Sequence, residues 1–161
     1  MESKKKTATC CFTGHRPEKL KQSEGAVKAA LRREIELAAS EGFTHFITGM
    51  ARGVDLWAAE EVLELKAESP ALRLIAALPF PRFEAGWSPE WQARYRRVLA
   101  GADQRFIISP AFSYAAFQKR NRWMVDRSGR VIAVYGGGRG GTLNTLEYAR
   151  AQGVPVRILP G

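Results

Sequence analysis

The chain has 161 residues, of which 45% are hydrophobic and 25% charged, a balance typical of one soluble packed domain and not of a disordered chain. No apolar run approaches the roughly 20 residues that cross a bilayer, and "MESKKK" leads into a segment too short and too soon polar for a secretory signal, so we expect a cytoplasmic protein without a membrane segment. The 25 basic and 16 acidic residues give a net charge of +9, which predicts attraction to nucleic acid or to phosphorylated small molecules.

The cysteines and histidines of this chain do not form a pattern typical of a metal site. Cys10 and Cys11 are adjacent in a predicted strand, so their side chains point to opposite faces of the sheet. Two cysteines are too few for a disulfide framework. The two histidines are far apart in the sequence. We therefore expect neither a metal site nor a bound cofactor.

Short apolar runs alternate with segments of helical period along the whole chain. Most of the runs are continuously apolar in the middle, as expected for strands that are buried on both faces. The predicted strands are residues 7–14, 44–49, 72–79, 104–109, 130–136 and 155–159.

The segments between these runs have recognisable helix ends. Ser23 is a predicted N-cap and Gly42 a predicted C-terminal stop, while Ser88 begins a second helix with Pro89 at its first position. Alternating strands and helices imply a parallel sheet with helices on both faces. The sequence thus predicts an α/β fold: a single Rossmann-like domain over residues 1–161, three-layered and doubly wound, with a mostly parallel sheet of about six strands. Ligands bind such folds beyond the carboxyl ends of the strands.

Three predicted strands end in glycine followed by a charged residue, in "FTGHRPEKL", "ITGMARGVDLWAAEE" and "VYGGGRGGTLNTLEYA". A glycine-rich turn that opens a helix lets backbone N–H groups approach a phosphate. The alternative is that the glycines only make tight turns, but three such loops at one sheet edge favour the phosphate. Thr142 and Thr145 would add hydroxyl donors at the start of the last helix. Neither a P-loop nor a standard dinucleotide fingerprint is present.

Polar residues near these loops are further candidates. Asp55 is predicted to cap the helix that follows it, and if it meets a ligand it should accept hydrogen bonds from ribose or base. Arg120 is a candidate phosphate fork. Asn121 falls on an apolar helical face and needs a hydrogen-bond partner, for which a neighbouring loop backbone is the favoured choice. That predicted face consists of Tyr114, Phe117, Met124 and Val125.

Aromatic and histidine residues give weaker signals. Phe80, Phe83 and Trp87 could stack on a base or pack onto the sheet as a lid, and the second interpretation is favoured. His15 is a candidate ligand contact. No Ser–His–Asp order, GxSxG elbow or HExxH motif indicates a hydrolase, so the sequence leaves open whether any reaction is catalysed.

Four segments together resemble the SLOG superfamily of Rossmann-like nucleotide-binding proteins: "TGHRP", "GMARGVD", "QKRNRWMVDRSG" and "GGGRGGTLNTLEYARAQGVPV". "CCFTGHRPEKL" and "GVDLWAAE" look most like its YpsA-like branch. The similarity runs from about Cys10 to Pro155, and the superfamily includes DNA-processing protein A and the cytokinin-activating phosphoribohydrolases. The resemblance implies a nucleotide or nucleotide-derived ligand. The binding positions it implies are Gly14, Arg16, Gly49, Arg52, Gly53, Asp55, Arg120, Asn121, Gly138, Gly140, Gly141 and Thr142.

One departure bears on catalysis. The phosphoribohydrolases carry "GGxGTxxE", whereas here Thr145 stands three residues after Thr142 and the nearest acid, Glu147, lies two further on. On a helix this shift turns the carboxylate by roughly 200°. The leading hypothesis is therefore a small domain that binds a nucleotide-sugar, ADP-ribose or NAD-like ligand in sensing or regulation. An N-glycosidase acting on nucleoside monophosphates and a single-stranded nucleic-acid binder remain alternatives, and the sequence leaves open whether the protein forms a homo-oligomer.

Overall fold

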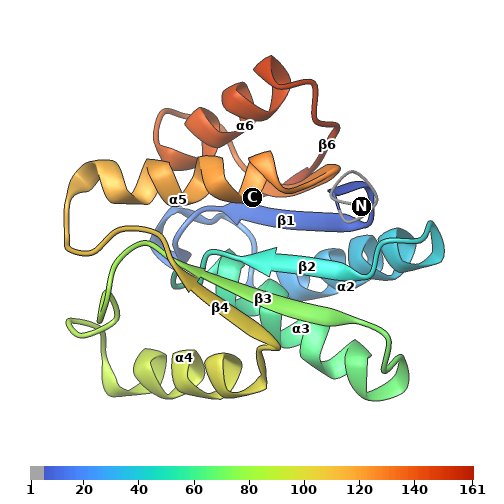
Figure 1. The fold of residues 1–161 in the computed structure, drawn as a ribbon, viewed down its shortest axis with the longest axis horizontal. Coiled ribbons are helices and arrows are strands. Elements are labelled where there is room, and N and C mark those ends of the chain that lie inside the picture. Colours follow the sequence, from blue (N-terminus) through green and yellow to red (C-terminus); the bar gives the residue numbers. More distant parts are fainter. Residues whose placement is uncertain (1–5) are drawn as a thin grey trace.

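The computed structural model describes residues 6–161, and residues 1–5 of the basic N-terminal stretch lie outside the described part. Six strands form one all-parallel sheet in the order β4-β3-β2-β1-β5-β6 (Figure 1). This confirms the predicted α/β, Rossmann-like architecture. The strands are β1 (Thr9–Gly14), β2 (His45–Thr48), β3 (Arg73–Leu78), β4 (Gln104–Ile107), β5 (Arg130–Tyr135) and β6 (Val156–Pro160).

Helices cover both faces of the sheet. The helices are η1 (Pro17–Lys19), α2 (Glu24–Ser40), α3 (Val54–Glu68), α4 (Pro89–Gly101), α5 (Tyr114–Asp126) and α6 (Gly141–Ala151). Two separate apolar clusters show that α2, α3 and α4 pack on one face and α5 and α6 on the other (Figure 1). Within residues 6–161, no helix combines the length and apolar character that crossing a membrane requires.

The central strands carry the core. As predicted, the adjacent thiols of β1 point to opposite faces: Cys10 lies in the cluster with α2 and α3, and Cys11 in the cluster with α5 and α6. β1, β2, β3 and β5 are largely buried, whereas the edge strands β4 and β6 are not. In β4, Phe106 is 41% exposed and Ile107 52% exposed. Their apolar sequence alone does not distinguish an edge strand from a central one.

The order of the strands creates a crevice between β1 and β5. From β1 the chain proceeds through β2 and β3 to β4 at one edge, and then returns to β5 on the other side of β1. The loops after β1 and β5 therefore diverge to opposite sides of the sheet, and the space between them is where ligands bind in doubly wound folds.

Helix capping separates two groups of helices. Ser23, Ser88 and Ser113 accept the N–H groups of Ala26, Trp91 and Ala116 and so cap α2, α4 and α5. The caps at Ser23 and Ser88 confirm the prediction. In contrast, α3 and α6 begin at glycines and have no side-chain cap. Both of these helices start in the loops that follow central strands.

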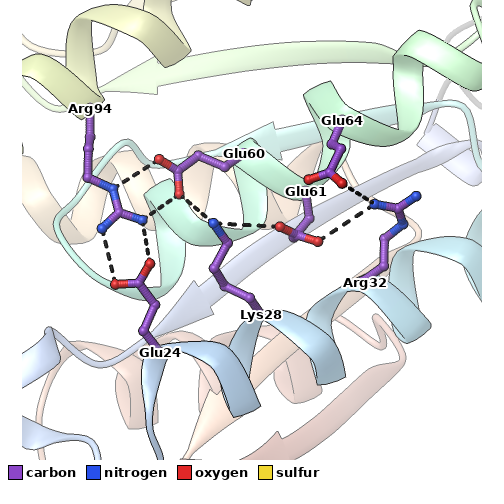
Figure 2. Close-up of polar contacts among 7 residues, drawn as sticks. All are labelled: Glu24, Lys28, Arg32, Glu60, Glu61, Glu64 and Arg94. Carbon is purple, nitrogen blue, oxygen red and sulfur yellow. Dashed lines mark hydrogen bonds and ion pairs between the residues drawn. The ribbon is translucent and has the colours of Figure 1, made fainter.

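A network of charged side chains joins α2, α3 and α4 on the outside of their layer (Figure 2). Arg94 of α4 donates to Glu60 of α3 at 2.6 and 3.0 Å and to Glu24 of α2 at 2.8 and 3.1 Å. Lys28 lies 3.1 Å from Glu60 and extends the network along α2. Burial alone would raise the pKa of Glu60, but the hydrogen bonds from Arg94 and Lys28 outweigh it and lower the pKa. Glu60 is therefore ionised and holds two cations.

We expect Arg94→Met to lower the free energy of unfolding by about 2 kcal/mol, because the half-buried Glu60 loses a guanidinium fork that also binds Glu24 of α2. Arg97→Met is the matched control, since Arg97 is exposed on the same helix. Urea unfolding of both variants measures the difference. Equal midpoints for the two variants would show that the network adds no stability.

Candidate functional site

A cleft of about 450 Å³ opens at the carboxyl ends of the central strands, between the loop after β1, the start of α3, helix α5 and the loop after β5. We call it the strand-end cleft. Nine of the predicted binding residues line it: Gly14, Arg16, Arg52, Asp55, Arg120, Asn121, Gly140, Gly141 and Thr142. Four predicted residues lie outside its lining: Gly49, Gly53, Gly138 and Thr145. Eight further residues line it: Thr13, His15, Lys19, Ala51, Phe83, Trp87, Phe117 and Arg139, of which His15 had been named as a candidate ligand contact.

The glycines of the first two loops allow close approach within the protein. A Cβ on Gly14 would lie 2.5 Å from Cβ of Val54, and one on Gly53 would lie 2.8 Å from the carbonyl oxygen of His15. A Cβ on Gly49 would lie 2.7 Å from Oδ2 of Asp55. These three glycines let the loops after β1 and β2 pack against the start of α3, so their space is already occupied by protein atoms.

The glycines after β5 are different. A Cβ on Gly138 or Gly141 would have no neighbour within 4 Å, and one on Gly140 would approach only Lys19 Nζ, at 3.9 Å. Gly140 has a φ of 140° and is the N-cap of α6, where no side-chain hydrogen bond caps the helix. Thr145 is buried one turn on and donates to the carbonyl oxygen of Gly141 at 2.8 Å. The first turn of α6 therefore presents backbone N–H groups to open space, with the positive end of the helix dipole behind them.

His15 ties this loop to the end of β1. The N–H group of Gly136 donates to Nε2 of His15 at 3.1 Å, and Nδ1 lies 3.5 Å from the hydroxyl of Thr142. Burial lowers the pKa of His15, and the charge of Lys19 lowers it further. A neutral ring with Nε2 as acceptor fits these contacts. The position of His15 directly after the first strand, at the topological switch, is the sequence signal for this contact.

Asp55 does not cap α3 as predicted, because the N-cap is Gly53 and Asp55 lies in the first turn of the helix. Its Oδ2 instead accepts the N–H group of Ala51 at 3.3 Å. Asp55 is only 7% exposed. Burial raises the pKa of this carboxyl to about 6, although the charge of Arg120 and the hydrogen bond from Ala51 lower it.

Arg120 is buried at the base of the strand-end cleft and only 5% exposed. Its Nη1 donates to the carbonyl oxygen of Gly49, and its Nε donates to Oδ1 of Asn121 at 2.8 Å. The sequence favoured a loop backbone as the hydrogen-bond partner of Asn121. The structure instead pairs Asn121 with Arg120, and Arg120 in turn donates to the loop after β2. Two nitrogens of the guanidinium are therefore engaged within the protein. Tyr114 does not join the apolar face of α5, since it is 86% exposed at the first position of the helix.

The charge of the strand-end cleft is strongly positive. Arg16, Lys19 and Arg139 line it and form no ion pair with any acid of residues 6–161. Arg52 is paired with Glu18 at 2.7 Å. Among the described residues, Asp55 is the sole carboxylate in the lining. No group of three or more His, Cys, Asp or Glu side chains within residues 6–161 is arranged to hold a metal ion.

Three aromatic side chains belong to the same cleft. Phe83, Trp87 and Phe117 line the strand-end cleft. The ring of Phe83 packs edge-to-face on Trp87 at 5.1 Å, and Phe117 packs in the same way on Phe80 at 5.4 Å. The segment between β3 and α4 is thus a packed lid, as its sequence favoured, and the same rings form one side of the cleft.

Comparison with known proteins identifies the family of this chain. A model for YpsA, described as the YspA SLOG family, matches residues 10–153. The chain is 30% identical over 161 residues to the UPF0398 protein YpsA of Bacillus subtilis, covering 92% of this chain and 89% of that protein. It is 37% identical over 127 residues to the uncharacterised SPbeta prophage-derived protein YoqJ of the same organism, covering 71% of this chain and 74% of YoqJ.

Solved structures share the fold. DNA processing protein A (DprA) of Streptococcus pneumoniae superposes with a TM-score of 0.67 at 21% identity, over 97% of this chain and 51% of that protein. DprA of Helicobacter pylori, whose structure is described with a unique single-stranded DNA binding mode, gives a TM-score of 0.67 at 17% identity, over 99% of this chain and 68% of that one. The family match over residues 10–153 supports the resemblance found in the sequence motifs. This chain belongs to the YspA SLOG family.

Proposed function

We propose that the strand-end cleft binds the phosphate of a nucleotide or nucleotide-derived ligand, and that the domain serves in sensing or regulation. One observation carries this proposal: α6 begins at an uncapped glycine and opens onto a cleft in which Arg16, Lys19 and Arg139 have no acidic partner among residues 6–161. An anion at this point would accept hydrogen bonds from the N–H groups of the first turn. Its negative charge would offset the positive end of the helix dipole and the charge of the cations.

The remaining lining supports a nucleotide rather than a bare phosphate. Phe83, Trp87 and Phe117 offer a surface for a base on the side of α4 and α5. Asp55 lies on the same cleft and accepts hydrogen bonds in its ionised form, which suits ribose hydroxyls and not a phosphate. A volume of about 450 Å³ is in the ordinary range for small-molecule sites.

The N-glycosidase alternative receives no support from the residue that the phosphoribohydrolase motif would require. Glu147 is exposed on α6 and is not part of the lining of the strand-end cleft. This agrees with its shift in the motif by two positions. Binding without cleavage by Glu147 is therefore the simpler proposal.

A single-stranded nucleic acid is the second candidate ligand. The net charge of +9 favours it, as do the cations at the cleft that have no acidic partner in the described part of the chain. The likeness in fold to the Helicobacter pylori protein described with a single-stranded DNA binding mode points to the same class of ligand. Such binding would weaken steeply with rising salt, because each phosphate contact releases counterions.

Gly141→Ala tests the phosphate site without disturbing the fold. A Cβ at Gly141 meets nothing within 4 Å, and alanine is favourable in a helix, so we expect the ligand-free melting temperature to stay the same or rise slightly. The added methyl group would occupy the space of the anion, so binding should weaken roughly tenfold or more. The measurements are thermal shift and titration calorimetry with the four nucleoside monophosphates, ADP-ribose and NAD.

Gly25→Ala is the matched control for this test. Gly25 lies in the first turn of α2, and a Cβ there also has no neighbour within 4 Å. We expect Gly25→Ala to keep the full ligand-induced shift. If Gly141→Ala keeps it as well, the anion does not bind at the start of α6 and the proposal is wrong. Gly140 is less suited to this test, because its φ of 140° would add backbone strain.

The pKa of Asp55 predicts a dependence of stability on pH. Since its pKa is about 6 in the folded protein against an ordinary 3.8, the folded state binds more protons than the unfolded state between these values. Wild-type protein should therefore lose stability relative to Asp55→Asn as pH rises from about 3 to about 7, by about 3 kcal/mol in total. Urea unfolding across this range measures the difference, and carbon NMR of the Asp55 carboxyl gives its midpoint. A midpoint near 3.8 together with a constant difference would contradict the prediction.

A further inference from the structure

A second cavity, of about 490 Å³, lies against the glycine-rich loop after β5. We call it the loop cavity, and it is lined by His15, Lys19, Lys21, residues 136–138 and Arg139. Three of these residues, His15, Lys19 and Arg139, also line the strand-end cleft. The two cavities therefore adjoin at these residues, and we call the shared boundary formed by Lys19 and Arg139 the ridge.

The chemistry of the loop cavity differs from that of the strand-end cleft. Among residues 6–161, its lining contains three cations, no carboxylate and no Phe, Tyr or Trp ring. Lys19, Lys21 and Arg139 form no ion pair with an acid of the described chain. Glycines 136, 137 and 138 supply backbone without side chains. This surface suits phosphate and sugar, whereas the rings that could bind a base, among residues 6–161, line the strand-end cleft.

The loop between the two cavities is held in place before any ligand arrives. The N–H group of Gly136 donates to His15, and the hydroxyl of Tyr135 donates to the carbonyl oxygen of Gly138 at 2.7 Å. Gly136 also packs on the backbone of Gly161, since a Cβ there would lie 2.9 Å from the oxygen of Gly161. Gly137 and Gly138 have φ values of 104° and 90°, and a Cβ on either would have no neighbour within 4 Å. The open surface of the loop is therefore a fixed part of the site.

We propose that the ligand carries a second phosphate, which crosses the ridge of Lys19 and Arg139 and binds in the loop cavity beside Lys21. This inference rests on the proposed function, because it assigns the base and the first phosphate to the strand-end cleft. The ligand class it names is a nucleotide extended at its phosphate. A diphosphate-linked small molecule and a short single strand of nucleic acid share this chemistry. A nucleoside monophosphate lacks it.

The experiment compares ligands of different length on full-length protein. The probes are the four nucleoside monophosphates, ADP-ribose and the four six-residue homo-oligodeoxynucleotides, with affinities measured by titration calorimetry at one salt concentration. We expect at least one extended probe to bind roughly tenfold tighter than the monophosphate with the same base. A gain for ADP-ribose alone would identify a small-molecule ligand, and a gain confined to oligonucleotides would identify nucleic acid.

Lys21→Gln tests the loop cavity, because Lys21 lines it and does not line the strand-end cleft. This change should weaken the extended probe roughly threefold to tenfold and leave monophosphate binding unchanged. Lys6→Gln is the control for overall charge, because Lys6 is exposed and precedes the amino end of β1, whereas the cavities lie at the carboxyl ends of the strands. Lys6→Gln should change neither affinity.

The outcomes separate this inference from the proposed function. If monophosphates bind but no extended probe binds more tightly, the second phosphate site is wrong while the nucleotide site stands. The same conclusion follows if Lys21→Gln and Lys6→Gln have equal effects on the extended probe. If none of the probes binds, the proposed function and this inference are both overturned.

Discussion

A buried guanidinium joins the two helical layers at the carboxyl end of the sheet. Arg120 comes from α5 on one face, donates to the carbonyl oxygen of Gly49 at the end of β2, and faces Asp55 of α3 on the other face. A buried cation needs such partners, because its loss of hydration is costly. The pairing explains why position 49 has no side chain and why Asn121 turns toward its neighbour. The floor of the strand-end cleft is thus fixed by electrostatics as much as by packing.

The distribution of charge follows from the same requirement for partners. Glu24, Glu60 and other acids of α2 and α3 are paired with Lys28, Arg32 and Arg94 in the helical layer (Figure 2). Part of the excess positive charge lies at the ends of β1 and β5, where Arg16, Lys19 and Arg139 have no acidic partner in residues 6–161. These three cations give the strand-end cleft a positive local potential.

Patterns local in the sequence predicted the fold well. The alternation of strands and helices, and the caps at Ser23 and Ser88, depend on neighbours a few residues away, and both are present. Predictions that depend on distant neighbours were less complete. Asp55 was expected to cap its own helix, but Gly53 of the preceding loop is the N-cap. The environment of Asp55 is set instead by burial and by the charge of Arg120, which comes from a distant part of the sequence. The glycine-rich loops look alike in sequence, yet only the distant contacts of Val54 and His15 separate the packing glycines from the open ones.

The two adjacent thiols of β1 have a consequence for the dynamics of the domain. Burial raises the pKa of Cys11 to about 12 and that of Cys10 even further, so neither thiol reacts readily in the closed molecule. Each becomes reactive only when the helical layer above it opens, and the two layers cover different thiols. The chain therefore contains two natural reporters of local opening, one for each face of the sheet, at neighbouring positions. Their relative rates of modification would reveal whether the layers separate together or one before the other.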